Sequence, residues 1–213
     1  MRSIGVLGGT FDPIHNGHIR LALEVSNKLK LHTIKLIPAN IPPHRSTPLA
    51  SANDRKKMVE LAILNQKNLS IDLRETENKN ISYTVNTLIS LRTEFPNDAL
   101  FLIVGEDVFN MIDTWKDWQS ILNYTHIIVA TRPEQNKKNI SDKLKVWRDK
   151  NRINNIKILK TTLSGYIFYI NTPIVKISSS MIREYYSERK TIDEYLPSNI
   201  ITYIKKNNLY MDN

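Results

Sequence analysis

The chain of 213 residues contains no cysteine. This absence excludes disulfides, zinc sites built from thiolates and a thiol nucleophile, and it is typical of proteins in a reducing compartment. Long apolar runs are also missing. The apolar stretch at the start, 1–7, is too short for a signal peptide, and no later segment approaches the length of a membrane span. We therefore expect a cytoplasmic protein without a membrane partner.

Acidic residues are outnumbered by basic ones, 21 against 30, which gives a formal net charge of +9. A charge of this sign is one mark of nucleic-acid-binding proteins. Here, however, the lysines are spread along the whole chain among many asparagines and isoleucines, rather than clustered as in a recognition surface. We expect no nucleic-acid partner, and the charge is consistent with small phosphorylated substrates.

Short apolar runs alternate with stretches in which apolar residues recur at helical spacing. The expected strands are 3–7, 33–37, 69–73, 99–104, 126–130, 156–159 and 166–169. The expected helices are 19–29, 54–64, 84–95 (begun by Ser82 or Thr84 as cap), 180–186 and 198–206, with helical turns from 105 to about 122. The polar stretch 134–155 is predicted to form a mobile loop and a peripheral helix.

This alternation predicts an α/β fold, a Rossmann-like, mostly parallel sheet with helices on both faces. The sequence shows no repeat and no linker, so we expect a single domain, 1–213, with a C-terminal helical closing segment at about 178–213. Ligands of such sheets bind beyond the carboxyl ends of the strands, where the strand order reverses. The segments to inspect are therefore 8–18, 38–45, 105–107 and 131–132.

Segment 8–18, Gly-Gly-Thr-Phe-Asp-Pro-Ile-His-Asn-Gly-His, holds three of the six glycines in the chain. Glycine lets a backbone approach a phosphate closely, and the following helix presents N–H groups and a positive dipole end. His15 and His18 are three residues apart at a helix start, so both imidazoles can point into one space. We expect a phosphate site here. A purely structural turn is the alternative.

Paired histidines are also typical of metal sites, but we expect none here. No third ligand is near, and the pattern His-Glu-x-x-His does not occur. The segment also differs from the dinucleotide fingerprint Gly-x-Gly-x-x-Gly and from a Walker loop.

A second candidate phosphate site lies at 177–184, Ile-Ser-Ser-Ser-Met-Ile-Arg-Glu. If Ser180 caps the helix, then Arg183 lies on its first turn. Hydroxyls, amides and a guanidinium would then gather at one helix start, which suits a polyphosphate. The alternative is an ordinary capping box in which Arg183 and Glu184 are surface charges.

Segment 8–18 resembles the Gly-Gly-Thr/Ser-Phe-Asp-Pro-x-His-x-Gly-His signature of the nucleotidylyltransferase superfamily. Segment 177–183 resembles its second signature, Ile-Ser-x-Ser/Thr-x-Ile-Arg, with Met181 before the Ile-Arg pair and serine at the hydroxyl position. Over nearly its full length the chain is similar to bacterial nicotinate-mononucleotide adenylyltransferases. The further matching pieces are Pro42-Pro43-His44-Arg45, 55–62, Ser82-Tyr83-Thr84, Gly105-Glu106-Asp107, Thr114-Trp115, Arg132-Pro133, Leu196-Pro197 and Tyr203-Ile204.

The resemblance implies transfer of AMP from ATP, with Mg²⁺, to nicotinate mononucleotide, giving deamido-NAD and pyrophosphate. It implies that His15, His18 and Arg183 are catalytic. The residues that it implies bind ATP are Gly8, Gly9, Thr10, Phe11, Gly17, Gly105, Asp107, Ser178 and Ser180. The residues that it implies bind the mononucleotide are His44, Arg45, Thr84, Trp115 and Arg132. The attacking phosphate is already ionised near neutral pH, so neither a protein base nor a covalent intermediate is expected.

Several alternatives stay open. Pantetheine-phosphate adenylyltransferases share part of the signature but are shorter and lack the Pro-Pro-His loop and the Thr-Trp pair. Nicotinamide mononucleotide is an alternative acceptor, which differs from nicotinate mononucleotide by a single group. A non-catalytic nucleotide-binding module is a further alternative, and it would lack turnover. Trp115 supplies an aromatic plane for a pyridine ring or packs as a core residue. Arg132 binds a phosphate or forms a surface salt bridge. Formation of a homo-oligomer is also left open.

Overall fold

A computed structural model gives the structure of residues 1–41, 47–78, 81–131, 140–173 and 177–211. Three of the predicted site residues, His44, Arg45 and Arg132, lie outside these described residues. So does one part, 134–139, of the polar stretch 134–155 for which a mobile loop and a peripheral helix were predicted.

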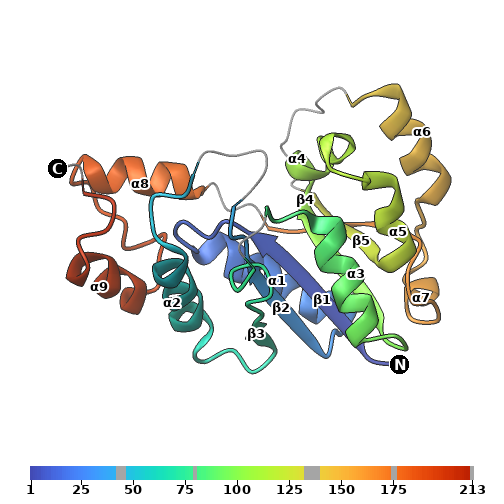
Figure 1. Cartoon of the computed structure of the whole chain (residues 1–213), viewed down its shortest axis with the longest axis horizontal. Helices are drawn as coiled ribbons and strands as arrows, with labels where there is room; N and C mark the ends of the chain where they lie inside the picture. Colours follow the sequence, from blue (N-terminus) through green and yellow to red (C-terminus); the bar gives the residue numbers. More distant parts are fainter. Residues whose placement is uncertain (42–46, 79–80, 132–139, 174–176, 212–213) are drawn as a thin grey trace. The chain divides into compact units, whose positions relative to one another are not determined.

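The strands form a six-stranded sheet of order β3-β2-β1-β4-β5-β6 (Figure 1). They are β1 (Ser3–Gly9), β2 (Thr33–Pro38), β3 (Leu69–Ile71), β4 (Ala99–Gly105), β5 (His126–Thr131) and β6 (Ile167–Asn171). The pairs β1–β4, β4–β5 and β5–β6 are parallel. The order reverses between β1 and β4, and in sheets of this order right-handed crossovers place helices on both faces. The predicted Rossmann-like α/β fold is confirmed.

The helices follow the predicted apolar spacing at most places. They are α1 (Asn16–Leu29), α2 (Ala52–Ile63), α3 (Thr84–Glu94), α4 (Glu106–Phe109), α5 (Ile121–Tyr124), α6 (Asp142–Asn151), α7 (Ile156–Leu159), α8 (Ser179–Ser187) and α9 (Ser198–Lys206), with 3-10 turns η1 (Ile112–Thr114) and η2 (Trp118–Ser120). Among the residues described, no helix combines the length and the apolar character needed to cross a membrane.

Two predictions about local structure are wrong. The expected strand 156–159 is helix α7, because the side chain of Asn155 accepts the N–H of Lys157 and starts a helical turn. The expected cap of α3 is also wrong. Its N-cap residue is Tyr83, without a side-chain cap bond, and the Ser82 hydroxyl instead accepts the N–H of Asn40 at 3.0 Å.

The chain forms two compact units, each built from separate stretches of sequence. The first comprises Met1–Leu7, Glu24–Lys35 and Tyr83–Ile174, and the second comprises Gly8–Leu23, Leu36–Ser82 and Val175–Asn213. In the second unit, α9 of the predicted closing segment lies beside α2 (Figure 1). The single domain 1–213 remains a prediction.

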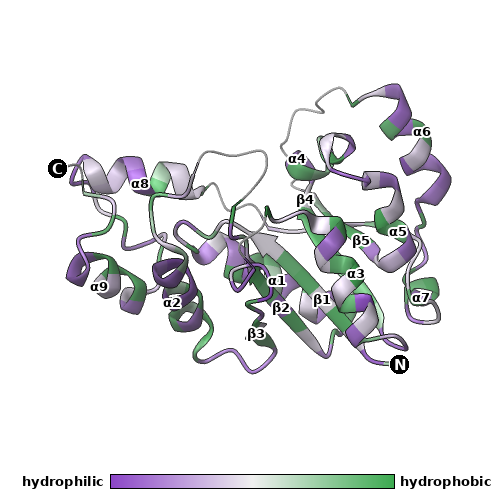
Figure 2. Cartoon of the chain, viewed as in Figure 1, coloured by the Kyte–Doolittle hydropathy of each residue, from purple (hydrophilic) through white to green (hydrophobic). Residues whose placement is uncertain are grey.

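The core of the first unit is built on the apolar strands. Figure 2 shows β1 and β4 in the green of hydrophobic residues, whereas α6 is mostly purple and hydrophilic. The six residues of β4 from Ala99 to Val104 are all buried. A strand covered on both faces needs this continuous apolar run, which explains why its position could be predicted.

One polar side chain in this core, His126 on β5, is fully buried. Its Nε2 lies 3.1 Å from the carbonyl oxygen of Thr162, and the N–H of Tyr166 donates to its Nδ1 at 3.3 Å. Only the neutral ring, with its proton on Nε2, satisfies both partners. Burial lowers the pKa of His126 to about 4. The hydrogen bond to Thr162 raises this pKa, and the positive charge of Arg92 lowers it further.

Protonation of His126 should therefore destabilise the fold in acid. The pKa is lower in the folded chain than in the unfolded one, so this group's contribution is complete above pH 6.5 and is lost as the pH falls toward about 4. The loss should reach about 3 kcal/mol in the free energy of unfolding. Urea denaturation of the wild type and His126→Gln at several pH values would measure it. A difference between the two proteins that stays constant from pH 7.5 to 4 would contradict this assignment.

Candidate functional site

The glycine–histidine segment, 8–18, runs from the end of β1 into α1 and belongs to the second unit. His15 precedes α1, and His18 lies in its first turn. The main-chain N–H of His15 donates to Nδ1 of His18 at 3.3 Å, while the N–H of His18 donates to the carbonyl oxygen of His15 at 2.9 Å. His18 thus reaches back to the helix start as the glutamate of a capping box does. This bond fixes its ring.

The two imidazoles share one space, as predicted. Their rings stack with centroids 3.7 Å apart and planes 22° apart. The ring of Phe11 meets His18 edge to face at 5.1 Å. His15 and Phe11 are buried, whereas His18 is half-buried. The pair is therefore held by packing on one side and reaches the surface through His18.

The glycines of this segment have different reasons to lack a side chain. A β-carbon at Gly9 would lie 2.9 Å from the Phe11 ring, and one at Gly17 would lie 2.8 Å from Ile177 and 3.0 Å from Nδ1 of His15. Packing therefore excludes a side chain at both positions. At Gly8 a β-carbon would meet nothing within 4 Å. The space beside exposed Gly8 is open to a ligand.

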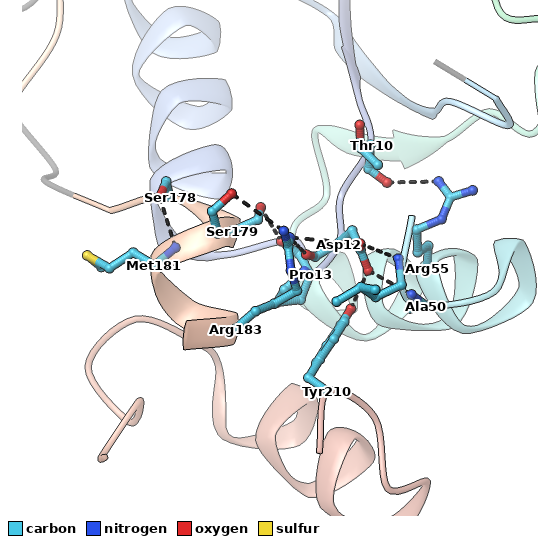
Figure 3. Close-up of polar contacts among 12 residues, drawn as sticks. Thr10, Asp12, Pro13, Ala50, Arg55, Ser178, Ser179, Met181, Arg183 and Tyr210 are labelled. Atoms are coloured by element: carbon cyan, nitrogen blue, oxygen red, sulfur yellow. Dashed lines mark hydrogen bonds and ion pairs between the residues drawn. The ribbon is translucent and has the colours of Figure 1, made fainter. Parts of the chain in front are cut away.

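The start of α8 is fastened to the same segment (Figure 3). Nη1 of Arg183 donates to the main-chain oxygen of Asp12 at 2.6 Å, and the hydroxyl of Ser179 donates to that of Pro13 at 2.9 Å. These bonds join residues more than 160 positions apart in the sequence. The structure thus brings the two signature segments together within one unit, with Arg183 bonded three residues before His15.

The predicted cap of α8 is corrected by the structure. Ser178, not Ser180, is the N-cap residue, and its hydroxyl accepts the N–H of Met181 at 3.2 Å. Ser178 fits because its extended backbone (φ −140°, ψ 155°) lies outside the helix, whereas Ser180 is already the second helical residue. Ser180 is exposed, and its hydroxyl lies 3.5 Å from Nη2 of Arg183. Both serines therefore still lie at the helix start.

Asp12 was not predicted as a site residue, although it lies inside the glycine–histidine segment. Its carboxylate is buried and accepts the N–H groups of Leu49 and Ala50, at 2.9 and 3.1 Å, and the hydroxyl of Tyr210 at 2.8 Å. Nη1 of Arg183 lies 3.8 Å from its Oδ2. One side chain thus ties together three segments that are remote in sequence (Figure 3).

Arg55 on α2 is a second buried support, with 1% of its surface exposed. Its guanidinium donates to the main-chain oxygens of Thr10, Ala39 and Asn40, at 2.8, 2.5 and 3.3 Å. Burial lowers its pKa, and the charge of Asp12 opposes this shift. A signal for Arg55 exists in the sequence. The buried residues of α2 are Arg55, Met58, Val59 and Ala62, so the arginine occupies an apolar helix register.

Four of the residues predicted for the mononucleotide and adenosine lie in the described part of the first unit: Thr84, Gly105, Asp107 and Trp115. Thr84 opens α3, and Trp115 follows η1. The ammonium of Lys116 lies 4.8 Å from the ring centroid of Tyr83, so the Tyr83-Thr84 and Trp115-Lys116 segments are neighbours. Trp115 is half-buried rather than a core residue. Its own N–H bonds to the carbonyl of Ile112 at 3.0 Å, so this amide already has a partner within the turn.

Gly105 ends β4, and Asp107 lies in the first turn of α4. The exposed carboxylate of Asp107 folds over Gly105, where a β-carbon would lie 2.5 Å from its Oδ1. Within the ranges that the structure describes, no three His, Asp or Glu side chains are grouped as metal ligands would be.

Comparison with known proteins adds an independent finding. Residues 6–185 match the model of the family described as cytidylyltransferase-like. A probable nicotinate-nucleotide adenylyltransferase of Psychromonas ingrahamii is 42% identical over 214 residues, 98% of this chain and 97% of the relative. One of Pseudomonas syringae pv. tomato is 37% identical over 98% of this chain and 94% of its own length.

Among solved structures, the nicotinic acid mononucleotide adenylyltransferase of Plasmodium falciparum complexed with NaAD superposes with a TM-score of 0.74. The match covers 99% of this chain and 98% of the other, at 22% identity, and so supports the fold alone. The family model, the relatives, both signatures and the strand order indicate the same family. The chain belongs to the cytidylyltransferase-like family and, within it, to the nicotinate-nucleotide adenylyltransferases.

Proposed function

We propose that this enzyme transfers AMP from ATP to nicotinate mononucleotide, giving deamido-NAD and pyrophosphate. The observation that carries the proposal is the hydrogen bonding of Arg183 and Ser179 to the Asp12-Pro13 turn. It places a guanidinium and a helix start on the segment that bears the stacked imidazoles. Such a gathering of donors suits a polyphosphate. The names of the relatives supply the reaction class.

The proposed step is a direct in-line displacement. A phosphate oxygen of the mononucleotide forms a bond to the α-phosphorus of ATP. The bond from that phosphorus to the oxygen that bridges the α- and β-phosphates breaks. The electron pair leaves with pyrophosphate. The attacking oxygen is already ionised, so the protein need not remove a proton. Mg²⁺ enters with the triphosphate as part of the substrate.

The protein's contribution is then positioning and charge stabilisation. Because Nδ1 of His18 accepts the N–H of His15, the proton of a neutral His18 ring belongs on Nε2. Nε2 can therefore donate to a phosphate oxygen that gains charge in the transition state. The guanidinium of Arg183 keeps further N–H groups besides the one bonded to Asp12, and these can bind the same polyphosphate.

For the acceptor, we propose that the Thr84 and Trp115 segments bind the nicotinate group. The ring of Trp115 offers a plane for the pyridine. Lys116 brings a positive charge beside Trp115, held over the ring of Tyr83. A cation at this place favours a carboxylate over an uncharged carboxamide. Arg132 is proposed to bind a substrate phosphate, and His44 and Arg45 are proposed to bind the mononucleotide.

The reaction itself can be tested directly. Purified protein with MgATP and nicotinate mononucleotide should release pyrophosphate and form a dinucleotide, detected by a coupled assay and by mass spectrometry. Parallel reactions with nicotinamide mononucleotide and phosphopantetheine should be at least tenfold slower in kcat/KM, because each lacks the carboxylate. Equal rates with nicotinamide mononucleotide would overturn the acceptor preference, and no pyrophosphate with any acceptor would overturn the proposed function.

The variant His18→Gln separates catalysis from helix capping. Glutamine at this position can still accept the N–H of residue 15, as in a capping box, so the free energy of unfolding should change little. The imidazole donor is lost, and kcat should fall by about a hundredfold. His18→Ala, the matched control, should lose both turnover and about 1 kcal/mol of stability. Wild-type turnover in His18→Gln would show that His18 serves only as a cap.

The variant Gly8→Ala tests whether a ligand approaches the backbone there. Its new methyl group meets no protein atom within 4 Å, so stability should be kept. The KM for ATP should rise by about tenfold, a loss near 1.4 kcal/mol, if the triphosphate occupies that space. Gly9→Ala should instead cost about 1–3 kcal/mol of stability through its clash with Phe11. Unfolding by urea and initial-rate kinetics distinguish the two, and an unchanged KM in Gly8→Ala would count against an ATP site here.

A further inference from the structure

Tyr210, which follows α9, makes a polar contact within the candidate ATP site. Its hydroxyl donates to Oδ1 of Asp12 at 2.8 Å, across 198 positions of sequence (Figure 3). Burial, together with the negative charge of Asp12, raises the pKa of Tyr210. Its hydroxyl is therefore a permanent donor near neutral pH. The backbone of Tyr210 adopts φ 63°, a left-handed conformation that costs energy in a non-glycine residue.

The carboxylate of Asp12 has few acceptor positions left. Oδ1 accepts from Ala50 and Tyr210, and Oδ2 accepts from Leu49. A carboxylate offers roughly four lone-pair positions, so these three bonds leave about one. That remaining position faces Nη1 of Arg183 at 3.8 Å, a longer separation than in a close ion pair. The same Nη1 instead donates to the main-chain oxygen of Asp12 at 2.6 Å.

We propose that Tyr210 is a positioning residue for Arg183. By occupying Oδ1 of Asp12, its hydroxyl withdraws charge from the carboxylate and keeps the guanidinium on the main-chain oxygen, where its other N–H groups remain available to the triphosphate. Without the hydroxyl, the carboxylate competes with the triphosphate for Arg183. The inference rests on the proposed role of Arg183 in binding MgATP.

The chain offers a matched control in Tyr203 on α9. Its hydroxyl also donates to an aspartate, Oδ1 of Asp54, at 2.9 Å, and both residues lie in the second unit. Asp54 accepts the hydroxyl of Ser51 at the start of α2, and among the described residues no hydrogen bond or ion pair joins Asp54 to Arg183. Tyr203→Phe and Tyr210→Phe each remove a hydrogen bond from a tyrosine hydroxyl to an aspartate, and only the second bears on the guanidinium.

The first measurement is the kinetics of both single variants with MgATP and nicotinate mononucleotide varied separately. Tyr210→Phe should raise the KM for ATP by about fivefold, the worth of one hydrogen bond, and leave the KM for the mononucleotide within twofold. Tyr203→Phe should leave both constants within twofold. Thermal unfolding should show that each variant is folded, with the larger loss of stability in Tyr210→Phe, because its partner Asp12 is buried. An equal rise in the KM for ATP in both variants would assign the effect to stability and overturn the proposal.

The second measurement is a double-mutant cycle with Arg183→Lys, which retains a positive charge but loses the planar fork. If Tyr210 acts through Arg183, adding Tyr210→Phe to Arg183→Lys should cause less than a twofold further change in kcat/KM for ATP. The same fivefold factor in both backgrounds would overturn the inference while leaving the proposed function intact. A wild-type protein that forms no pyrophosphate would instead show that the proposed function itself has failed.

Discussion

The buried carboxylate of Asp12 is the interaction on which the second unit's site depends. Removing a charged group from water costs several kcal/mol unless its oxygens are fully hydrogen-bonded. Here two main-chain N–H groups and a tyrosine hydroxyl provide these bonds, each worth about 1.5–3 kcal/mol to a charged acceptor. Because each of these bonds offsets part of that cost, the segments at residues 12, 49–50 and 210 hold one another in place.

Arg55 secures the other side of the same turn by an equivalent principle. Its guanidinium replaces lost hydration with three carbonyl oxygens, from Thr10 and from the 39–40 segment after β2. These carbonyls lie where two strands end, so they have no ladder partners there. A cation buried among carbonyl dipoles therefore fixes the exits of β1 and β2. The rigid frame lets the imidazoles of His15 and His18 keep one orientation before any substrate binds.

Sequence patterns predicted the parts of this fold that local rules determine. The continuous apolar run of β4 was evident because burial on both faces requires consecutive apolar residues. The glycine–histidine segment was evident because close approach of a backbone to a phosphate favours glycines near one another in sequence. The four residues of α7 were misassigned because so short an apolar run fits the spacing of a strand as well as that of a helix. The helical turn is started by the hydrogen bond from the N–H of Lys157 to the side chain of Asn155. Arg55 could have been found from its apolar register. Tyr210 left no signal, because its partner lies 198 positions away and no local pattern encodes such a contact.

The proposed chemistry explains why buried supports rather than reactive groups distinguish this site. A nucleophile supplied by the substrate, already ionised, makes an activated cysteine or serine unnecessary, and the chain contains no cysteine. What the reaction requires is a set of donors fixed within fractions of an ångström of the phosphate oxygens. His18 is fixed by its bond to the helix start, and Arg183 by its bond to Asp12. Asp12 and Arg55 therefore serve the proposed reaction by holding the turn that carries these donors.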